Sequence, residues 1–332
     1  MINNYQTFLL ENVSMSLEMI INIIKSLKGN ENKELVNKLT NYADKNGKTV
    51  LMSIVQSNNQ ELIDYILKYK IDLQAKDKIG RNILFYCKNI KTFKNFYDLG
   101  VDPKATMKIK KQDEEHKSVV AGYKNILHYL SSKNIFNVDI YERLIRDGIS
   151  INDTDAYGNS VIVYSILNKG IIQLLLKNGA KIDDIEIQQK MMVQLFDAFK
   201  WYKTKRSLVI SIFKMLFDNG IEFNMYDLSK ILIDLDTWYS EKVDMVENFI
   251  KPLLKYFNED KLLSILKHYH QNSNNSMRSI EFSKRLLNLG IYPKMYTYLQ
   301  QYYRNSSNGF NEIFKDYIKN HPYIEDSEKY NI

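Results

Sequence analysis

The chain has 332 residues, of which 45% are hydrophobic and 26% charged, so it can bury one long core or two ordinary ones. Its single cysteine, Cys87, excludes an internal disulfide framework and predicts a reducing, cytoplasmic compartment. The net charge of +7 comes almost entirely from Lys, whereas bidentate recognition of phosphate or guanine favours Arg, so the charge is weak evidence for a nucleic-acid partner. No apolar run is long enough to predict a membrane span.

Residues 1–42 are predicted to form a helical N-terminal cap. Apolar residues recur at helical spacing between Leu17 and Leu27, and the pattern resumes at Leu35 after a break at Gly29 and Asn30. We interpret this segment as a degenerate capping repeat. A separate helical hairpin predicts nearly the same pattern.

A turn followed by a helix start recurs within residues 43–184. The stretch from Asp44 to Leu51 (DKNGKTVL) returns 33 residues later, from Asp77 to Leu84 (DKIGRNIL), and in altered form at 122–128 and 155–162. One position in each copy holds a residue type whose side-chain oxygen caps the free N–H groups of a helix start. These predicted caps are Thr49, Asn82, Asn125 and Ser160.

Glycine marks both ends of most of these repeated segments. A glycine before each cap, Gly122 in the third copy, is expected to allow a tight turn. In the first copy Lys70 takes the closing position, where a left-handed backbone would be strained. Five glycines follow apolar helices and fit the left-handed position that ends a helix, namely Gly100, Gly148, Gly179, Gly220 and Gly290.

The apolar spacing between these landmarks predicts two short helices per unit. One such pair cannot bury both of its apolar faces alone, so units of this size occur in arrays of three or more.

These residues resemble the ankyrin repeat. The family has a 33-residue period, opens its first helix with Asp-x-x-Gly-x-Thr-Pro-Leu-His and closes its second with Leu-Leu-x-x-Gly-Ala. The matching residues are Asp44, Gly47, Thr49, Leu51, Leu175, Leu176, Gly179, Ala180 and Asp183. No copy has the Pro, and the small Ala pair of the first helix is mostly lost, which suits a divergent bacterial or viral member.

The resemblance implies an all-α fold, an ankyrin-type helical solenoid with short hairpin turns and degenerate capping repeats. It covers residues 43–184. It also implies a local hydrogen bond for His128, which occupies the family's His position.

The third unit contains an insertion near residues 107–120. Gly80 and Gly122 lie 42 residues apart, about nine more than the period. The charges of residues 108–117 run positive, acidic and positive again. We expect an extended hairpin here, which is either a recognition finger or a solvated loop.

Residues 185–332 keep the closing landmark but lose the turn. An apolar helix is predicted from Leu208 to Phe217, and Gly220 and Gly290 lie 70 residues apart, near two periods. This region is either a run of degenerate ankyrin-like units or a separate all-helical domain.

The sequence contains no group of catalytic or metal-binding residues above background. His268 and His270 lie on opposite sides of a predicted helix with no Cys or acidic partner at ligand spacing. There is no glycine-rich phosphate loop and no G-x-S-x-G motif. We therefore expect a protein that is not an enzyme and uses no cofactor or metal.

The ankyrin resemblance implies a non-enzymatic scaffold that binds a partner protein through a concave face and hairpin tips. The alternative is a bacterial or viral effector, acting in the host cytoplasm, whose C-terminal half recruits or modifies a host component. Tyr123 and Tyr157 are expected at turn tips, where Tyr supplies contact area at low entropy cost. The full set of expected partner-binding residues is Lys45, Lys48, Lys78, Arg81, Tyr123, Tyr157 and Asn159.

Overall fold

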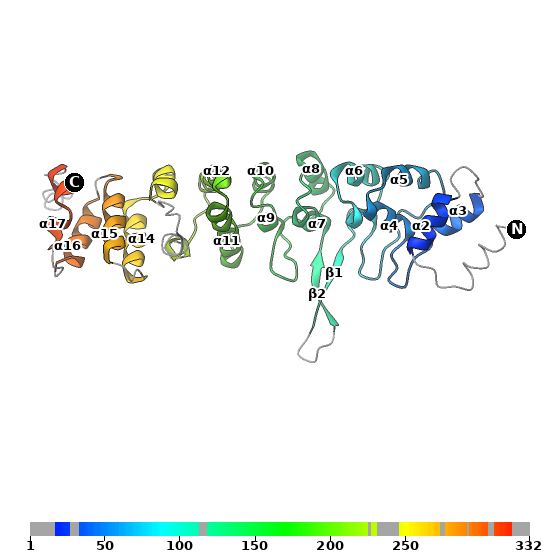
Figure 1. Ribbon diagram of the computed structural model, residues 1–332, viewed down its shortest axis with the longest axis horizontal. Helices are drawn as coiled ribbons and strands as arrows, with labels where there is room; N and C mark the ends of the chain where they lie inside the picture. Colours follow the sequence, from blue (N-terminus) through cyan, green and yellow to red (C-terminus); the bar gives the residue numbers. More distant parts are fainter. Residues whose placement is uncertain are drawn as a thin grey trace. The chain divides into compact units, whose positions relative to one another are not determined.

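The structure is a computed structural model that describes residues 17–26, 33–112, 118–224, 227–230, 246–272, 276–290, 292–304 and 309–320. Most of these residues are helical, and they include one two-stranded sheet. The chain divides into two compact units, Met1–Lys181 and Ile182–Ile332, each of which is described by itself (Figure 1).

Unit 1 consists of short helices and the sheet. Its elements are α2 (Leu17–Ser26), α3 (Lys33–Thr40), α4 (Val50–Ser57), α5 (Gln60–Ile66), η1 (Ile83–Tyr86), α6 (Ile90–Asp98), β1 (Met107–Gln112), β2 (Ser118–Lys124), α7 (Ile126–Ser132), α8 (Val138–Arg146), α9 (Val161–Tyr164) and α10 (Lys169–Lys177).

The first helices of successive pairs in unit 1 contact one another in chain order. Helix α4 packs on the 3₁₀ helix η1, η1 packs on α7, and α7 packs on α9. Each of these four elements buries nearly all of its apolar residues, and Cys87, just after η1, is also fully buried. Mutual burial of short apolar helices is therefore what holds unit 1 together.

Side-chain oxygens cap three of the four predicted helix starts. Thr49 and Asn125 each accept a hydrogen bond at 3.1 Å from the N–H three residues later, and Asn82 accepts one at 3.1 Å from the N–H two residues later. The prediction is wrong for Ser160, which precedes α9 but makes no side-chain cap bond. Its hydroxyl is buried and has no hydrogen-bond partner among the described residues.

The left-handed closing position is confirmed for four of the five predicted glycines. Gly100, Gly148, Gly179 and Gly220 have φ values from +76° to +86°. Gly290 is the exception, because its φ is not in the positive range that favours glycine. A turn with negative φ ends that helix, and other residue types tolerate such a turn.

Lys70 does not adopt the strained backbone that its position suggests. Positive φ among the described non-glycine residues is confined to Asn58 and Asn134. The Lys70 N–H donates to Asn37 Oδ1 at 3.1 Å, and its carbonyl accepts a 2.9 Å bond from the Asn41 amide. Two side chains from the preceding helical segment thus replace the glycine turn.

Three side-chain amides within unit 1 each join the loop after one helical pair to the loop after the next pair. Each amide donates to a backbone carbonyl of the later loop and accepts from the backbone N–H two residues further on, at 2.8 to 3.0 Å. The three joints are Asn41 with Lys70 and Asp72, Gln74 with Gly100 and Asp102, and Asn152 with Gly179 and Lys181.

The insertion near residues 107–120 contains β1 and β2, an antiparallel hairpin that projects from the helices of unit 1 (Figure 1). Residues 113–117, including the acidic run, lie outside the described residues. Gly122 was expected in a turn, but it lies within β2. A Cβ at this position would lie 3.0 Å from atoms of Ala156, so the glycine allows the hairpin to approach the 155–159 turn closely.

Unit 2 is helical in its described part. Its elements are α11 (Ile185–Trp201), η2 (Lys203–Lys205), α12 (Arg206–Asp218), the π-helical turn η3 (Val246–Ile250), η4 (Lys251–Tyr256), α14 (Glu259–Asn272), α15 (Ser276–Leu287), α16 (Pro293–Tyr302), α17 (Gly309–Ile313) and α18 (Lys315–Asn320). Three fully or nearly fully buried rings, Phe196, Phe213 and Phe249, join α11, α12 and η3, with ring centroids 5.1 to 5.5 Å apart.

Two glycine substitutions should separate backbone strain from steric clash. Gly80 and Gly100 have φ values of +91° and +83°, so Ala at either position should cost about 1 to 2 kcal/mol for the left-handed backbone. At Gly80 the new Cβ would also lie 2.5 Å from the Thr106 carbonyl oxygen, whereas at Gly100 it meets nothing within 4 Å. Gly80→Ala should therefore lower the free energy of unfolding in urea clearly more than Gly100→Ala, and equal losses would contradict the close approach.

Candidate functional site

Three turns of unit 1 share one hydrogen-bond pattern centred on an aspartate. The Oδ1 atom of Asp44, Asp77 and Asp155 accepts N–H bonds from the residues two and four positions later, at 2.8 to 3.2 Å. The N–H of the glycine three positions later donates to the carbonyl of the same Asp. This pattern, typical of Asx turns, fixes the backbone that displays the neighbouring side chains.

Six of the seven predicted partner-binding residues lie in these turns. Lys45 and Lys78 directly follow the Asp and are exposed, whereas the residues four positions after it are half-buried. The half-buried residues are Lys48, Arg81 and Asn159. The remaining two are aromatic: Tyr157 lies in the third turn, whereas Tyr123 lies in β2 and not at the turn tip where it was expected.

Backbone hydrogen bonds place the first two turns and the hairpin side by side. The Lys78 N–H donates to the Asn46 carbonyl at 2.9 Å, and the Lys108 N–H donates to the Ile79 carbonyl at 2.8 Å. The basic side chains of the turns and of β1 therefore share one edge of unit 1.

The second turn holds a buried carboxylate between a cation and a phenol. Asp77 Oδ2 accepts a 2.7 Å bond from Arg81 Nε and another from the Tyr86 hydroxyl. The Arg81 guanidinium lies 4.7 Å from the Tyr86 ring centre, and Lys48 Nζ lies 5.6 Å from it. Burial alone would raise the pKa of Asp77, but the bonds from Tyr86 and Arg81 outweigh it and hold that pKa below its ordinary value.

The third turn repeats this arrangement with a cation from another element. The buried Asp155 Oδ2 accepts a 2.6 Å bond from the Tyr164 hydroxyl and lies 3.3 Å from Lys124 Nζ in β2. Lys124 Nζ is also 4.5 Å from the Tyr164 ring centre. Burial raises the pKa of Asp155, but the bonds from Tyr164 and the turn backbone, with Lys124, lower it overall. The ion pair thereby anchors the hairpin to the turn.

Sequence reasoning missed Tyr86, Tyr164 and Lys124. The two tyrosines carry a signal, because each lies nine residues after the turn Asp, where the first copy has Ser53. Lys124 carries none, because its partner Asp155 lies 31 residues away and the contact depends on how the hairpin docks.

The two faces of the hairpin have different surroundings. Lys111 lies on the face towards the third turn: its Nζ donates to the Ala156 carbonyl at 2.6 Å and lies 4.7 Å from the Tyr157 ring centre. Side chains alternate along a strand, and the register pairs Lys108 with Tyr123 and Lys110 with Val120 on the opposite face. Tyr123 therefore lies on one face of the hairpin, whereas Tyr157, from the third turn, lies beside the other face. Their side chains are 52% and 54% exposed respectively.

The predicted local role of His128 is confirmed. Its Nδ1 lies 2.8 Å from Asn125 Oδ1, and its Nε2 lies 2.9 Å from the Asp153 carbonyl oxygen. The ring is buried, and burial lowers its pKa. His128 thus links the start of α7 to the loop that precedes α9.

In unit 2, His270 is the centre of a polar and aromatic cluster. Its Nδ1 lies 3.1 Å from the Tyr298 hydroxyl, its Nε2 lies 3.0 Å from Ser283 Oγ, and its ring stacks on Tyr302 at 4.0 Å. Burial lowers the pKa of His270 to about 4, so the ring is neutral at pH 7. The cluster has no acidic side chain among these contacts, which suits a packed core better than proton transfer.

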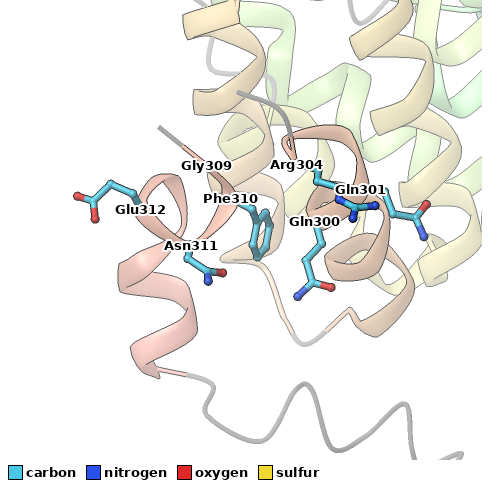
Figure 2. A pocket seen from close by; sticks show the side chains of 7 residues that line it. All are labelled: Gln300, Gln301, Arg304, Gly309, Phe310, Asn311 and Glu312. Atoms are coloured by element: carbon cyan, nitrogen blue, oxygen red, sulfur yellow. The ribbon is translucent and has the colours of Figure 1, made fainter. Parts of the chain in front are cut away.

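A hollow of about 670 Å³ lies between α16 and α17. Figure 2 shows Gln300, Arg304 and Phe310 turned towards this hollow and Glu312 turned away from it. The arrangement therefore brings no acid and base together. Residues 305–308, which connect its two sides, lie outside the described residues.

Comparison with models of known families found no match, and neither did a search of curated proteins. In the described ranges, no three His, Cys, Asp or Glu side chains are grouped so that they could hold a metal ion. No helix among the described residues combines the length and apolar character that crossing a membrane requires.

Removing the Tyr86 hydroxyl should destabilise unit 1 in a pH-dependent way. Tyr86→Phe should lower the free energy of unfolding at pH 7 by about 1.5 to 3 kcal/mol, because a buried carboxylate loses a donor. The Asp77 pKa is depressed in the folded state, so this contribution is present above about pH 4 and is lost as pH falls through the lowered pKa.

Urea unfolding at pH 7 and pH 3 measures this effect. Tyr129→Phe is the control, because its hydroxyl makes only a long 3.4 Å bond to the Cys87 carbonyl. A Tyr86→Phe loss that is no larger than the control loss, or that is the same at both pH values, would contradict the proposed role of the phenol.

Acid should destabilise unit 2 through His270. Its folded pKa lies below the unfolded value of about 6.5, so the unfolded state binds the extra proton first and stability falls between about pH 6.5 and pH 4, by up to about 3 kcal/mol. His270→Gln should flatten this dependence more than His268→Gln, because His268 is less buried. Urea unfolding at pH 7 and pH 4.5 compares the two variants, and equal slopes would refute the assignment.

Proposed function

We propose that residues 43–184 form ankyrin-like repeats and that the protein is a non-enzymatic scaffold for a partner protein. Three features of unit 1 support the repeat proposal: the Asp-centred turns, the first helices that contact one another in chain order, and the amide joints between the loops of consecutive helical pairs. On this proposal the segment of α2 and α3 is a degenerate capping repeat, and unit 2 is either a run of degenerate ankyrin-like repeats or a separate helical domain.

The observation that carries the binding proposal is the display of two tyrosines on rigid supports, on opposite sides of the hairpin, so a partner that contacts both must embrace the hairpin. Tyr157 is 54% exposed in a turn whose buried Asp155 accepts hydrogen bonds from two backbone N–H groups and a phenol and forms an ion pair with Lys124. Tyr123 is 52% exposed on a hairpin anchored by Lys124 of the same strand. An exposed aromatic ring on a fixed backbone loses little entropy when a partner covers it.

The basic residues of the turns add positive charge to the proposed binding surface around the two tyrosines. Lys45 and Lys78 are exposed, and Lys48 and Arg81 lie around the Tyr86 ring. Charges at the rim of an interface chiefly raise the association rate and select the partner. We expect the Tyr rings to supply most of the affinity and the cations to favour a partner with an acidic rim.

The double variant Tyr123→Ala and Tyr157→Ala should lose the partner without losing stability. The test is affinity capture from host-cell lysate with the full chain, followed by mass spectrometry and a melting curve for each variant. Proteins retained by the wild type should fall at least about tenfold with the double variant, because interface tyrosines often contribute more than 1 kcal/mol each.

Tyr202→Ala is the matched control. Tyr202 is 54% exposed in unit 2 and has a lysine 4.5 Å from its ring centre, as Tyr157 has at 4.7 Å. Captured proteins that survive the double variant, or that are lost equally with Tyr202→Ala, would refute the proposed binding surface.

A further inference from the structure

Two exposed aromatic rings and a cluster of cations meet where α11 leads into α12. Trp201 and Tyr202 are 58% and 54% exposed, which is unusual for side chains of this size. Lys200 Nζ lies 5.0 Å from the Trp201 ring centre, and Lys205 Nζ lies 4.5 Å from the Tyr202 ring centre. We call the segment from Lys200 to Arg206 the basic aromatic patch.

The sequence of this patch contains several cations and no acidic residue. Between Asp197 and Asp218 the sequence contains five cations and no acidic residue. Four of the five lie within the seven residues of the patch itself, which are Lys200, Trp201, Tyr202, Lys203, Thr204, Lys205 and Arg206. A compact cluster of this kind attracts an anionic surface.

The patch also begins a helix in an electrostatically unfavourable way. Helix α12 has Lys205 at its N-cap and Arg206 at its first position, with no side-chain cap bond and no acidic residue in the first turn. The N-terminus of a helix carries partial positive charge, so cations there are normally disfavoured. An external anion would relieve this repulsion.

A hollow beside the patch extends the cationic surface along α12. It has a volume of about 460 Å³, and Arg206 and Lys214 contribute its positive charge and Ser207 a hydroxyl. Its one acidic side chain, Glu247, is 2.7 Å from Lys251. The hollow therefore presents net positive charge to a ligand of lipid-headgroup size.

We propose that the basic aromatic patch binds the anionic surface of a lipid bilayer. Trp and Tyr rings favour the headgroup region, where the ring is partly desolvated and its polar atom stays in water. Lysines beside the rings attract anionic lipids, and the two effects add. This is peripheral binding, which requires no membrane-crossing helix and is independent of the partner-binding surface of unit 1.

A single-stranded nucleic acid is the other polyanion to consider. Base stacking needs free ring faces, whereas a lysine lies near the ring centres of both Trp201 and Tyr202. Arg206 is the only arginine of the patch, although Arg is the preferred residue for bidentate phosphate contacts. These observations favour the bilayer.

Co-sedimentation of the full chain with vesicles tests the proposal. The protein should pellet with vesicles of phosphatidylserine and phosphatidylcholine, should remain free with phosphatidylcholine alone, and should dissociate as salt is raised. Lys203→Glu with Lys205→Glu should weaken binding at least about tenfold. Lys91→Glu with Lys94→Glu makes the same charge change at two exposed residues of α6 in unit 1 and should leave binding nearly unchanged.

Tryptophan fluorescence tests the aromatic part of the patch separately. The chain has two tryptophans, Trp201 and Trp238, so a Trp238→Phe variant reports Trp201 alone. Its emission should shift to the blue with anionic vesicles, and Tyr202→Ala should weaken pelleting while circular dichroism stays unchanged. The proposal is overturned by three outcomes: no pelleting of the wild type, equal losses for the two charge-reversed pairs, or patch-dependent binding of a labelled oligothymidylate without vesicle binding.

Discussion

The hydrogen bonds from turn backbone to the carboxylates of Asp44, Asp77 and Asp155 are the constraint that orients three of the four first helices of unit 1. They set the direction in which the chain enters α4, η1 and α9, and so determine where the apolar faces of these elements meet. In the second and third turns a phenol and a cation complete the carboxylate's hydrogen bonds, which makes burial of the charge tolerable. Stable turns in fixed positions are also what an interaction surface requires.

Much of unit 1 could be predicted from local sequence, because its turns and helix ends are set by residues close together in the chain. Left-handed glycines and capping side chains at Thr49, Asn82 and Asn125 follow from intrinsic backbone and hydrogen-bonding preferences. Two of the errors arose where a neighbouring segment of the fold decides the outcome, unlike those at Ser160 and Gly290. Lys70 is held by side chains of the preceding helical segment, and Gly122 serves a close contact with Ala156.

The candidate surface was less predictable than the helices for the same reason. The turn residues Lys45, Lys78 and Tyr157 could be recognised from their positions, but Tyr123 was assigned to a turn because a glycine precedes it. Lys124 joins Asp155 only after the hairpin has docked. Unit 2 lacks the turn signature, so its exposed aromatic residues became visible only when burial was known.

The amide joints carry an evolutionary consequence. Each joint uses the side chain of one unit and only the main chain of the next, so it does not depend on which side chains the following unit carries. On the proposed repeat architecture, duplication or loss of a whole repeat would leave each of these joints with a main-chain acceptor and donor. A chain of such repeats could change its length by complete repeats while their side chains diverge.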